Sequence, residues 1–189
     1  VNGLLAGTHT GGYTAFTLDI TKLLREGENT LTVAVRDDTD TVPLARGKQK
    51  TKRGGIWYTP QSGIWQTVWL EDRPQAYIQD WQGVTRINGE VEITVQADAA
   101  DGSEICACFA GQCWKNAVRQ GAAKLCLAIE NPCLWSPDSP YLYEGSLKLG
   151  GDEVFTYFGI REIRAGNVDG RGYKWILLNG KPIYLNGTL

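Results

Sequence analysis

Residues 55–71 hold the side chains of this sequence that are best suited to bind a small molecule. The stretch contains four broad aromatic residues, Trp57, Tyr58, Trp65 and Trp69. An indole or phenol ring offers an apolar face to a sugar ring, and its N–H or O–H can still hydrogen-bond hydroxyl groups. Trp57 and Tyr58 lie in a glycine- and proline-rich approach, of the kind where loops often carry binding residues. We therefore take Trp57 and Tyr58 as the candidate substrate-binding residues.

The second half of this stretch has the alternation of a β-strand. Trp65, Thr67 and Trp69 fall on one face by period two. Because the other face also carries apolar residues, we expect the strand at 65–71 to be covered on both sides. Trp65 and Trp69 are then predicted to lie in the core of a β-sandwich.

Charged clusters elsewhere are less informative. Asp37, Asp38 and Asp40 form the densest group of carboxylates, but they follow a predicted strand on an open loop, where aspartate favours turns and solvation. The basic run at 46–53 is interpreted as a solvated loop, because the chain has 19 basic and 21 acidic residues and a net charge of −2. This balance predicts no general affinity for nucleic acid or an anionic membrane surface.

The cysteines predict free thiols. Their odd number and their confinement to a short segment fit poorly with a disulfide framework. The sole histidine, His9, is distant in sequence, and C-x-C is not the usual zinc spacing, so we predict no metal ligands. Buried thiols indicate a reducing, cytoplasmic compartment. The five cysteines are Cys106, Cys108, Cys113, Cys126 and Cys133.

Neither end of the sequence reads as the end of a protein. The chain begins at Val1, contains no methionine, and has no apolar run near the roughly 18 residues of a membrane-spanning helix. The apolar residues that precede Leu189 have no predicted pairing partner. We therefore expect this chain to be part of a longer protein.

The pattern of elements is all-β and divides into three parts. In residues 1–72, strands are expected at 13–20, 30–36 and 65–71, with one helical turn that Asp19 or Thr21 could cap. Residues 73–164 carry short strands separated by turn dipeptides such as Asn-Gly and Asp-Gly, a pattern typical of an immunoglobulin-like sandwich. These strands are expected at 76–81, 91–97, 104–110, 124–130, 142–149 and 154–164.

The third part, residues 165–189, holds a predicted hairpin. Asn179-Gly180 suits its type I′ turn. Within the second part of the chain, the prolines around 134–136 predict a rigid segment without a helix.

Four motifs, in order and spacing, resemble the non-catalytic front of glycoside hydrolase family 2, the group of β-galactosidases, β-glucuronidases and β-mannosidases. They are Ser62-Gly-Ile-Trp-Gln-Thr-Val-Trp-Leu-Glu71, Leu134-Trp-Ser-Pro-Asp-Ser-Pro-Tyr-Leu-Tyr143, Tyr157-Phe-Gly-Ile-Arg-Glu-Ile163 and Leu178-Asn-Gly-Lys-Pro-Ile-Tyr-Leu-Asn-Gly187. The resemblance implies part of a sugar-binding jelly-roll at 1–72, an immunoglobulin-like sandwich at 73–164, and a hairpin at 165–189 leading into a (β/α)8 barrel.

The resemblance also implies where the chemistry lies. In this family both catalytic carboxylates belong to the barrel, beyond Leu189, and retaining hydrolysis needs them about 5–5.5 Å apart. We therefore predict no catalytic residue, no metal and no cofactor in this chain. Its expected partners are the barrel in cis, a β-glycoside, and a second copy of the chain if that copy supplies missing strands.

The resemblance is broken at one position of interest. Several family members place an acidic residue where this sequence has Trp57, which puts a simple transfer of galactoside or glucuronide specificity in doubt. Ring stacking would then replace hydrogen bonds to sugar hydroxyls. Two other functions remain open: a stand-alone carbohydrate-binding module, and a protein-interaction sandwich with no role in sugar binding.

Overall fold

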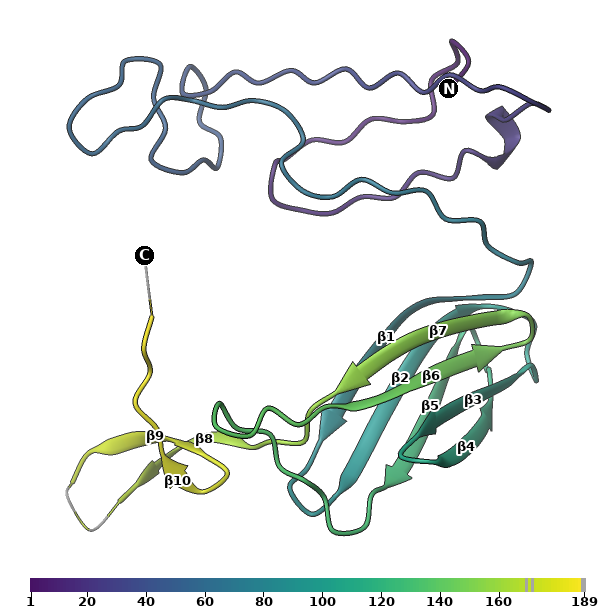
Figure 1. Cartoon of the computed structure of the whole chain (residues 1–189). Helices are drawn as coiled ribbons and strands as arrows, with labels where there is room; N and C mark the ends of the chain where they lie inside the picture. Colours follow the sequence, from purple (N-terminus) through teal and green to yellow (C-terminus); the bar gives the residue numbers. More distant parts are fainter. Residues whose placement is uncertain (169, 171, 188–189) are drawn as a thin grey trace. The chain divides into compact units, whose positions relative to one another are not determined.

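The computed structural model describes residues 1–168, 170 and 172–187 (Figure 1). The described residues form β-strands and one short 3₁₀ turn, and they contain no α-helix, so the all-β prediction is confirmed. None of the described helical segments is long and apolar enough to span a membrane. The chain separates into two compact units, Val1–Leu70 and Glu71–Leu189.

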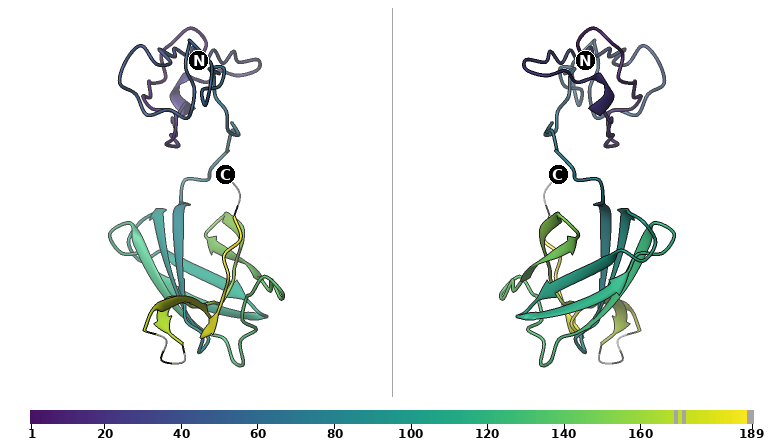
Figure 2. Two further views of the ribbon diagram at one scale, coloured as in Figure 1. Left: turned by 90° about the vertical axis from the view of Figure 1, so that its left-hand side faces the viewer. Right: turned by 90° about the vertical axis from the view of Figure 1, so that its right-hand side faces the viewer.

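The second unit contains a β-sandwich. In both sheets of the sandwich, each strand runs antiparallel to its neighbours. The first sheet has the order β1 (Tyr77–Thr85), β2 (Glu90–Asp98) and β5 (Ala122–Ala128). The second has the order β4 (Gln112–Ala117), β3 (Glu104–Phe109), β6 (Tyr143–Leu149) and β7 (Asp152–Phe158). Figure 2 shows the same strands from two further sides.

Alternation along the strands builds the core between these sheets. On β2, Val91, Ile93 and Val95 are almost completely buried, while the residues between them are less covered. Ile105 on β3 and Leu147 on β6 are fully buried in the same cluster. Each such side chain contributes about 1.5–3 kcal/mol through removal of apolar surface from water.

The predicted strands of this unit are largely confirmed, with two differences. The expected strand at 154–164 is divided into β7 and β8 (Ile163–Asn167). At the break, Ile160 is buried and bridges to Leu134, and Gly159 packs against the Trp135 side chain. Strand β4 was not predicted, because its residues alternate poorly between buried and exposed positions.

The predicted C-terminal hairpin is present. Strand β9 (Lys174–Leu178) lies between β8 and β10 (Lys181–Pro182) in a small antiparallel sheet. Asn179 and Gly180 have φ angles of 50° and 78°, as a type I′ turn requires.

The first unit corrects the sequence analysis. All of residues 1–70 are described, and apart from one 3₁₀ turn they contain isolated bridges and extended segments but no regular strand. The expected strands at 13–20, 30–36 and 65–71 therefore lack the hydrogen-bonded neighbour on which a strand depends. Without that neighbour their apolar side chains stay uncovered: Trp65 and Trp69 are 67% and 66% exposed, so their predicted core position is wrong in this structure.

The predicted helical turn does form, as the 3₁₀ turn η1 (Thr21–Leu23). The Asp19 carboxylate accepts a hydrogen bond from the Thr21 N–H at 2.9 Å. A hydrogen bond from the Thr21 hydroxyl, with a smaller effect from this N–H, lowers the pKa of Asp19. Asn2 also ties distant parts of the unit together, because its Oδ1 accepts from the Thr30 N–H at 3.0 Å and its Nδ2 donates to the Leu23 carbonyl at 3.0 Å.

Candidate functional site

Tyr58 lies on a loop whose backbone is fixed by neighbouring residues. Its N–H donates to the Lys48 carbonyl at 2.7 Å, and its own carbonyl accepts from the Lys50 N–H at 3.2 Å. These bonds form a parallel bridge between Gln49 and Tyr58. The Tyr58 side chain is nevertheless 69% exposed, so a firmly held backbone presents a free phenol ring.

Trp57 is held differently, at the end of a tight turn. Its N–H donates to the Gly54 carbonyl at 3.1 Å, and its carbonyl accepts from the Gly54 N–H at 3.3 Å. Gly54 and Gly55 have φ angles of 147° and 60°, a combination that a side chain would strain. The Trp57 ring is half-buried, in contrast to the exposed ring of Tyr58.

A lysine covers part of the Trp57 ring. The Lys50 Nζ lies 4.1 Å from the ring centroid, within the range of a cation–π interaction. At an exposed site such a contact contributes about 0.5–1 kcal/mol. Lys50 therefore competes with any ligand for that part of the indole, and Tyr58 is the more available of the two predicted contact residues.

Hydrogen bonds from side chains hold the rest of this loop. The Asp40 Oδ1 accepts from the Thr51 hydroxyl at 2.6 Å and from the Thr51 N–H at 3.1 Å. The Gln49 Oε1 accepts from the Gln61 N–H at 2.8 Å. The conformation of the loop around Trp57 and Tyr58 is therefore held by polar contacts more than by burial of apolar side chains.

The aspartate cluster serves as a set of hydrogen-bond acceptors. Asp37 accepts from the Ser62 hydroxyl at 2.7 Å and from the Thr39 N–H at 2.7 Å. The bond from Ser62, with a smaller effect from Thr39, lowers the pKa of Asp37. Asp38 forms an ion pair with Arg36 at 3.0 Å. These are the turn-forming contacts expected of Asp37, Asp38 and Asp40.

The cysteines differ from the prediction of buried free thiols. Cys108 and Cys113 form a disulfide, and the free Cys126 and Cys133 are exposed. The pairing follows from the register of β3 and β4, which places Cys108 directly opposite Cys113. The sequence analysis missed this disulfide because it did not predict β4, and a hairpin with a two-residue turn at Ala110-Gly111 was the available signal.

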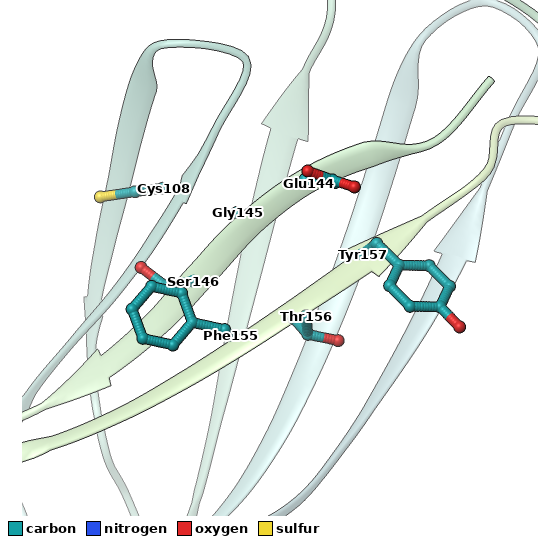
Figure 3. A pocket seen from close by; sticks show the side chains of 7 residues that line it. All are labelled: Cys108, Glu144, Gly145, Ser146, Phe155, Thr156 and Tyr157. Carbon is teal, nitrogen blue, oxygen red and sulfur yellow. The ribbon is translucent and has the colours of Figure 1, made fainter.

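A shallow hollow on the outer face of the second sheet is a further candidate surface (Figure 3). Phe155 and Tyr157 project from β7 and are 80% and 61% exposed. Glu144 and Ser146 lie beside them on β6, and Cys108 on β3 completes the lining. The hollow joins aromatic rings with a carboxylate and a hydroxyl, which suits contact with a polar ligand or protein more than catalysis.

The hollow was not predicted, although strand alternation contained the signal. Val154 and Phe158 point toward the core, so Phe155 and Tyr157 must point outward. Close pairing of the strands beneath the hollow needs Gly145, because a Cβ there would collide with the Cys108 carbonyl oxygen.

Comparison with known proteins gives matches over most of the chain. Residues 76–161 match the family model described as Glycosyl hydrolases family 2. A β-galactosidase of Thermoanaerobacter pseudethanolicus is 30% identical over 217 residues, which cover 99% of this chain and 26% of that protein. A β-glucuronidase of Paenibacillus borealis is 27% identical over 209 residues, covering 99% of this chain and 34% of that protein.

Among solved structures, the crystal structure of Ruminococcus gnavus β-glucuronidase matches 60% of this chain and 20% of its own chain, with 22% identity and a TM-score of 0.44. The chain thus spans about a quarter to a third of the length of the two sequence relatives. The resemblance inferred from the four sequence motifs is confirmed by the family model and by these relatives.

Proposed function

We propose that this chain, a glycoside hydrolase family 2 sequence by its match over residues 76–161, is a non-catalytic part of a β-glycosidase. It supports a catalytic barrel in cis and lines the sugar site with Trp57 and Tyr58. The observation that carries the second statement is the exposed Tyr58 ring on a backbone that two hydrogen bonds fix in place.

The state of the carboxyl groups supports a non-catalytic role. Glycoside hydrolysis needs a general acid whose pKa is raised. Among the described residues, every carboxyl group with a shifted pKa has that pKa lowered, chiefly by hydrogen bonds: Asp19, Asp37, Asp40 and Glu153. Glu92 and Glu104 are each paired with a lysine at 2.8 Å on the surface.

The substrate class follows from the relatives and from the type of contact. The relatives are named β-galactosidase and β-glucuronidase, so a β-linked glycoside is the proposed substrate of the whole protein. An aromatic wall recognises the apolar face of a pyranose without fixing the pattern of its hydroxyls. Tyr58 and Trp57 therefore contribute binding energy, and the barrel selects the sugar.

The division of roles is tested with a panel of nitrophenyl β-glycosides. We expect the protein that contains both this chain and its barrel to cleave at least one of them, and the isolated chain to cleave none. Hydrolysis by the isolated chain contradicts the non-catalytic role. A whole protein that cleaves none of the panel, and whose barrel lacks both catalytic carboxylates, contradicts the glycosidase proposal.

The role of Tyr58 is tested in the whole protein. Tyr58→Ala is expected to raise KM several-fold with less effect on kcat, because a stacking contact binds substrate and transition state alike. Tyr58→Phe keeps the ring and shows whether the hydroxyl matters. Tyr157→Ala, the same change at an exposed tyrosine of the sandwich, is the matched control. Equal KM values for all three variants contradict a sugar contact by Tyr58.

Isothermal titration of the isolated chain with oligosaccharides separates the remaining functions. On the proposal above, binding is millimolar or absent, because the barrel supplies most of the site. Micromolar binding that Tyr58→Ala abolishes would instead identify a stand-alone carbohydrate-binding module. A protein-interaction sandwich predicts no oligosaccharide binding, and the nitrophenyl β-glycoside panel on the whole protein separates it from our proposal. The exposed Phe155 and Tyr157 would then be the residues to examine.

A further inference from the structure

Three cysteine sulfurs gather on the outer face of the hairpin formed by β3 and β4. Cys106 and Cys108 are two residues apart on β3 and share one face, and their Sγ atoms are 3.5 Å apart. Cys113 is opposite Cys108 on β4 and is joined to it by the disulfide. All three Sγ atoms lie within 4.8 Å of one another.

This spacing is close to that of a thiolate metal centre. In a tetrahedral zinc site with Zn–S bonds of about 2.3 Å, two sulfurs lie about 3.8 Å apart. The separation of the Cys106 and Cys108 sulfurs is already similar. Once the Cys108–Cys113 bond is broken, a small movement of the Cys113 side chain, which is exposed, completes a triangle of donors.

The surrounding charges suit a metal bound by thiolates. Three thiolates and one Zn²⁺ carry a net charge of −1. In the strand registers, Lys115 on β4 and Lys148 on β6 both lie opposite Cys106, on either side of it. Their ion pairs with Glu104 and Glu153 are 2.8 and 3.0 Å long and exposed, so the two ammonium groups can also offset the charge of the centre.

We propose that Cys106, Cys108 and Cys113 bind one Zn²⁺ ion through three thiolates when the disulfide is reduced. The fourth tetrahedral position faces solvent and takes a water molecule. The sequence spacing gives no sign of this site, because the third donor comes from the neighbouring strand.

The disulfide and the metal site are alternative states of one hairpin. A dithiol reductant transfers two electrons and two protons to the Cys108–Cys113 bond and itself becomes a disulfide, leaving two thiols on the chain. Binding of Zn²⁺ then displaces three protons, one from each thiol. Oxidation of the loaded site by a disulfide reverses these steps and releases the ion.

The test uses the full chain with Cys126 and Cys133 both replaced by serine, so that only the three clustered cysteines remain. After reduction by a phosphine without oxygen, it is titrated with Cd²⁺, whose bonds to thiolates give an ultraviolet charge-transfer band. Zn²⁺ binding is measured by competition with a chromogenic chelator. We expect one equivalent of each ion to bind to the reduced chain, and none to the oxidised chain.

Single variants identify the ligands. Cys106→Ser, Cys108→Ser and Cys113→Ser are each expected to weaken Zn²⁺ binding by more than about 100-fold, because loss of a supporting residue alone costs about 10–100-fold. Circular dichroism checks that each variant keeps the sandwich, as expected for changes on the outer face of a sheet. Equal binding by oxidised and reduced chain, unchanged binding in any of the three variants, or no binding at all would overturn the proposal.

Discussion

Asn179 donates a hydrogen bond from its side-chain Nδ2 to the carbonyl oxygen of Trp135, at 3.0 Å and across 44 residues of sequence. Its Oδ1 accepts from the Glu162 N–H, also at 3.0 Å. The residue that allows the type I′ turn of the C-terminal hairpin therefore also joins this hairpin to the proline-rich segment that follows the sandwich strand β5. One side chain sets both the turn and its place in the second unit.

Replacement of Asn179 separates these two roles. Asn179→Ala removes both side-chain bonds and places a residue that disfavours positive φ in the turn, so we expect a loss of about 1–3 kcal/mol in the free energy of unfolding. Asn179→Gly also removes both bonds, but glycine adopts the positive φ of this turn without strain. Its loss in the free energy of unfolding should therefore be smaller. Urea denaturation measures both. If the glycine variant is no more stable than the alanine variant, the backbone conformation contributes nothing.

The sandwich core gives a second prediction. Leu147 is fully buried between the two sheets, and Leu147→Ala should cost about 2–5 kcal/mol through lost burial and the cavity left behind. Phe155→Ala removes a larger side chain that is 80% exposed, and it should change stability by less than about 0.5 kcal/mol. Guanidinium denaturation compares the two. A similar cost for both variants would mean that Phe155 is covered in solution.

Sequence patterns predict the sandwich well because the alternation that buries one face of a strand can be read within that strand. Val91, Ile93 and Val95 alternate with polar residues, and turns that contain glycine flank the strand. The predicted strand at 91–97 therefore agrees with β2 to within one residue at each end. Strand β4 lacks this signal: Trp114 is half-buried and its neighbours are exposed on both faces. The missed strand also hid the disulfide, since the partner of Cys108 depends on the register between two strands.

The first unit and the candidate site depend on contacts that sequence patterns do not contain. Leu31, Val33 and Val35 alternate as clearly as β2 does, yet all three are more than half exposed, because no neighbouring strand pairs with them. Aromatic residues and turn signals predict Trp57 and Tyr58 as candidate binding residues, and their contact with a sugar stays a prediction. The position of Lys50 over Trp57 could not be predicted, because it depends on the path of the loop between them.

The loop that carries Tyr58 should loosen in acid. Hydrogen bonds from the Thr51 hydroxyl and, to a lesser degree, the Thr51 N–H lower the pKa of Asp40. Its folded pKa thus lies below the unfolded value of about 3.9, so the stabilisation is complete above that pH and is lost as pH falls through the folded pKa. We expect the NMR shift of the Thr51 amide to titrate with a midpoint below 3.9.

Asp40→Asn is the control for this titration, because an amide keeps an acceptor oxygen but does not ionise in this range. The Thr51 amide of this variant should show no such transition. A transition in the wild type with its midpoint at or above the ordinary aspartate value would contradict the lowered pKa of Asp40.

Tyr143 gives the opposite pH dependence. Its hydroxyl oxygen accepts from the Cys133 N–H at 2.7 Å, and burial of the ring raises the pKa of Tyr143. The neutral phenol of Tyr143 therefore stabilises the folded chain fully below the unfolded pKa of about 10. This stabilisation is lost as pH rises through the higher pKa of the folded chain.

Alkaline denaturation of Tyr143→Phe tests this assignment. The variant leaves the Cys133 N–H without its acceptor, so we expect a loss of about 1–3 kcal/mol at neutral pH. Its free energy of unfolding should then fall less steeply above about pH 10 than that of the wild type, because the buried phenol no longer has to ionise. Tyr157→Phe, at an exposed ring, should keep the wild-type slope. Identical slopes in all three proteins would show that Tyr143 ionises as readily in the folded chain as in the unfolded one.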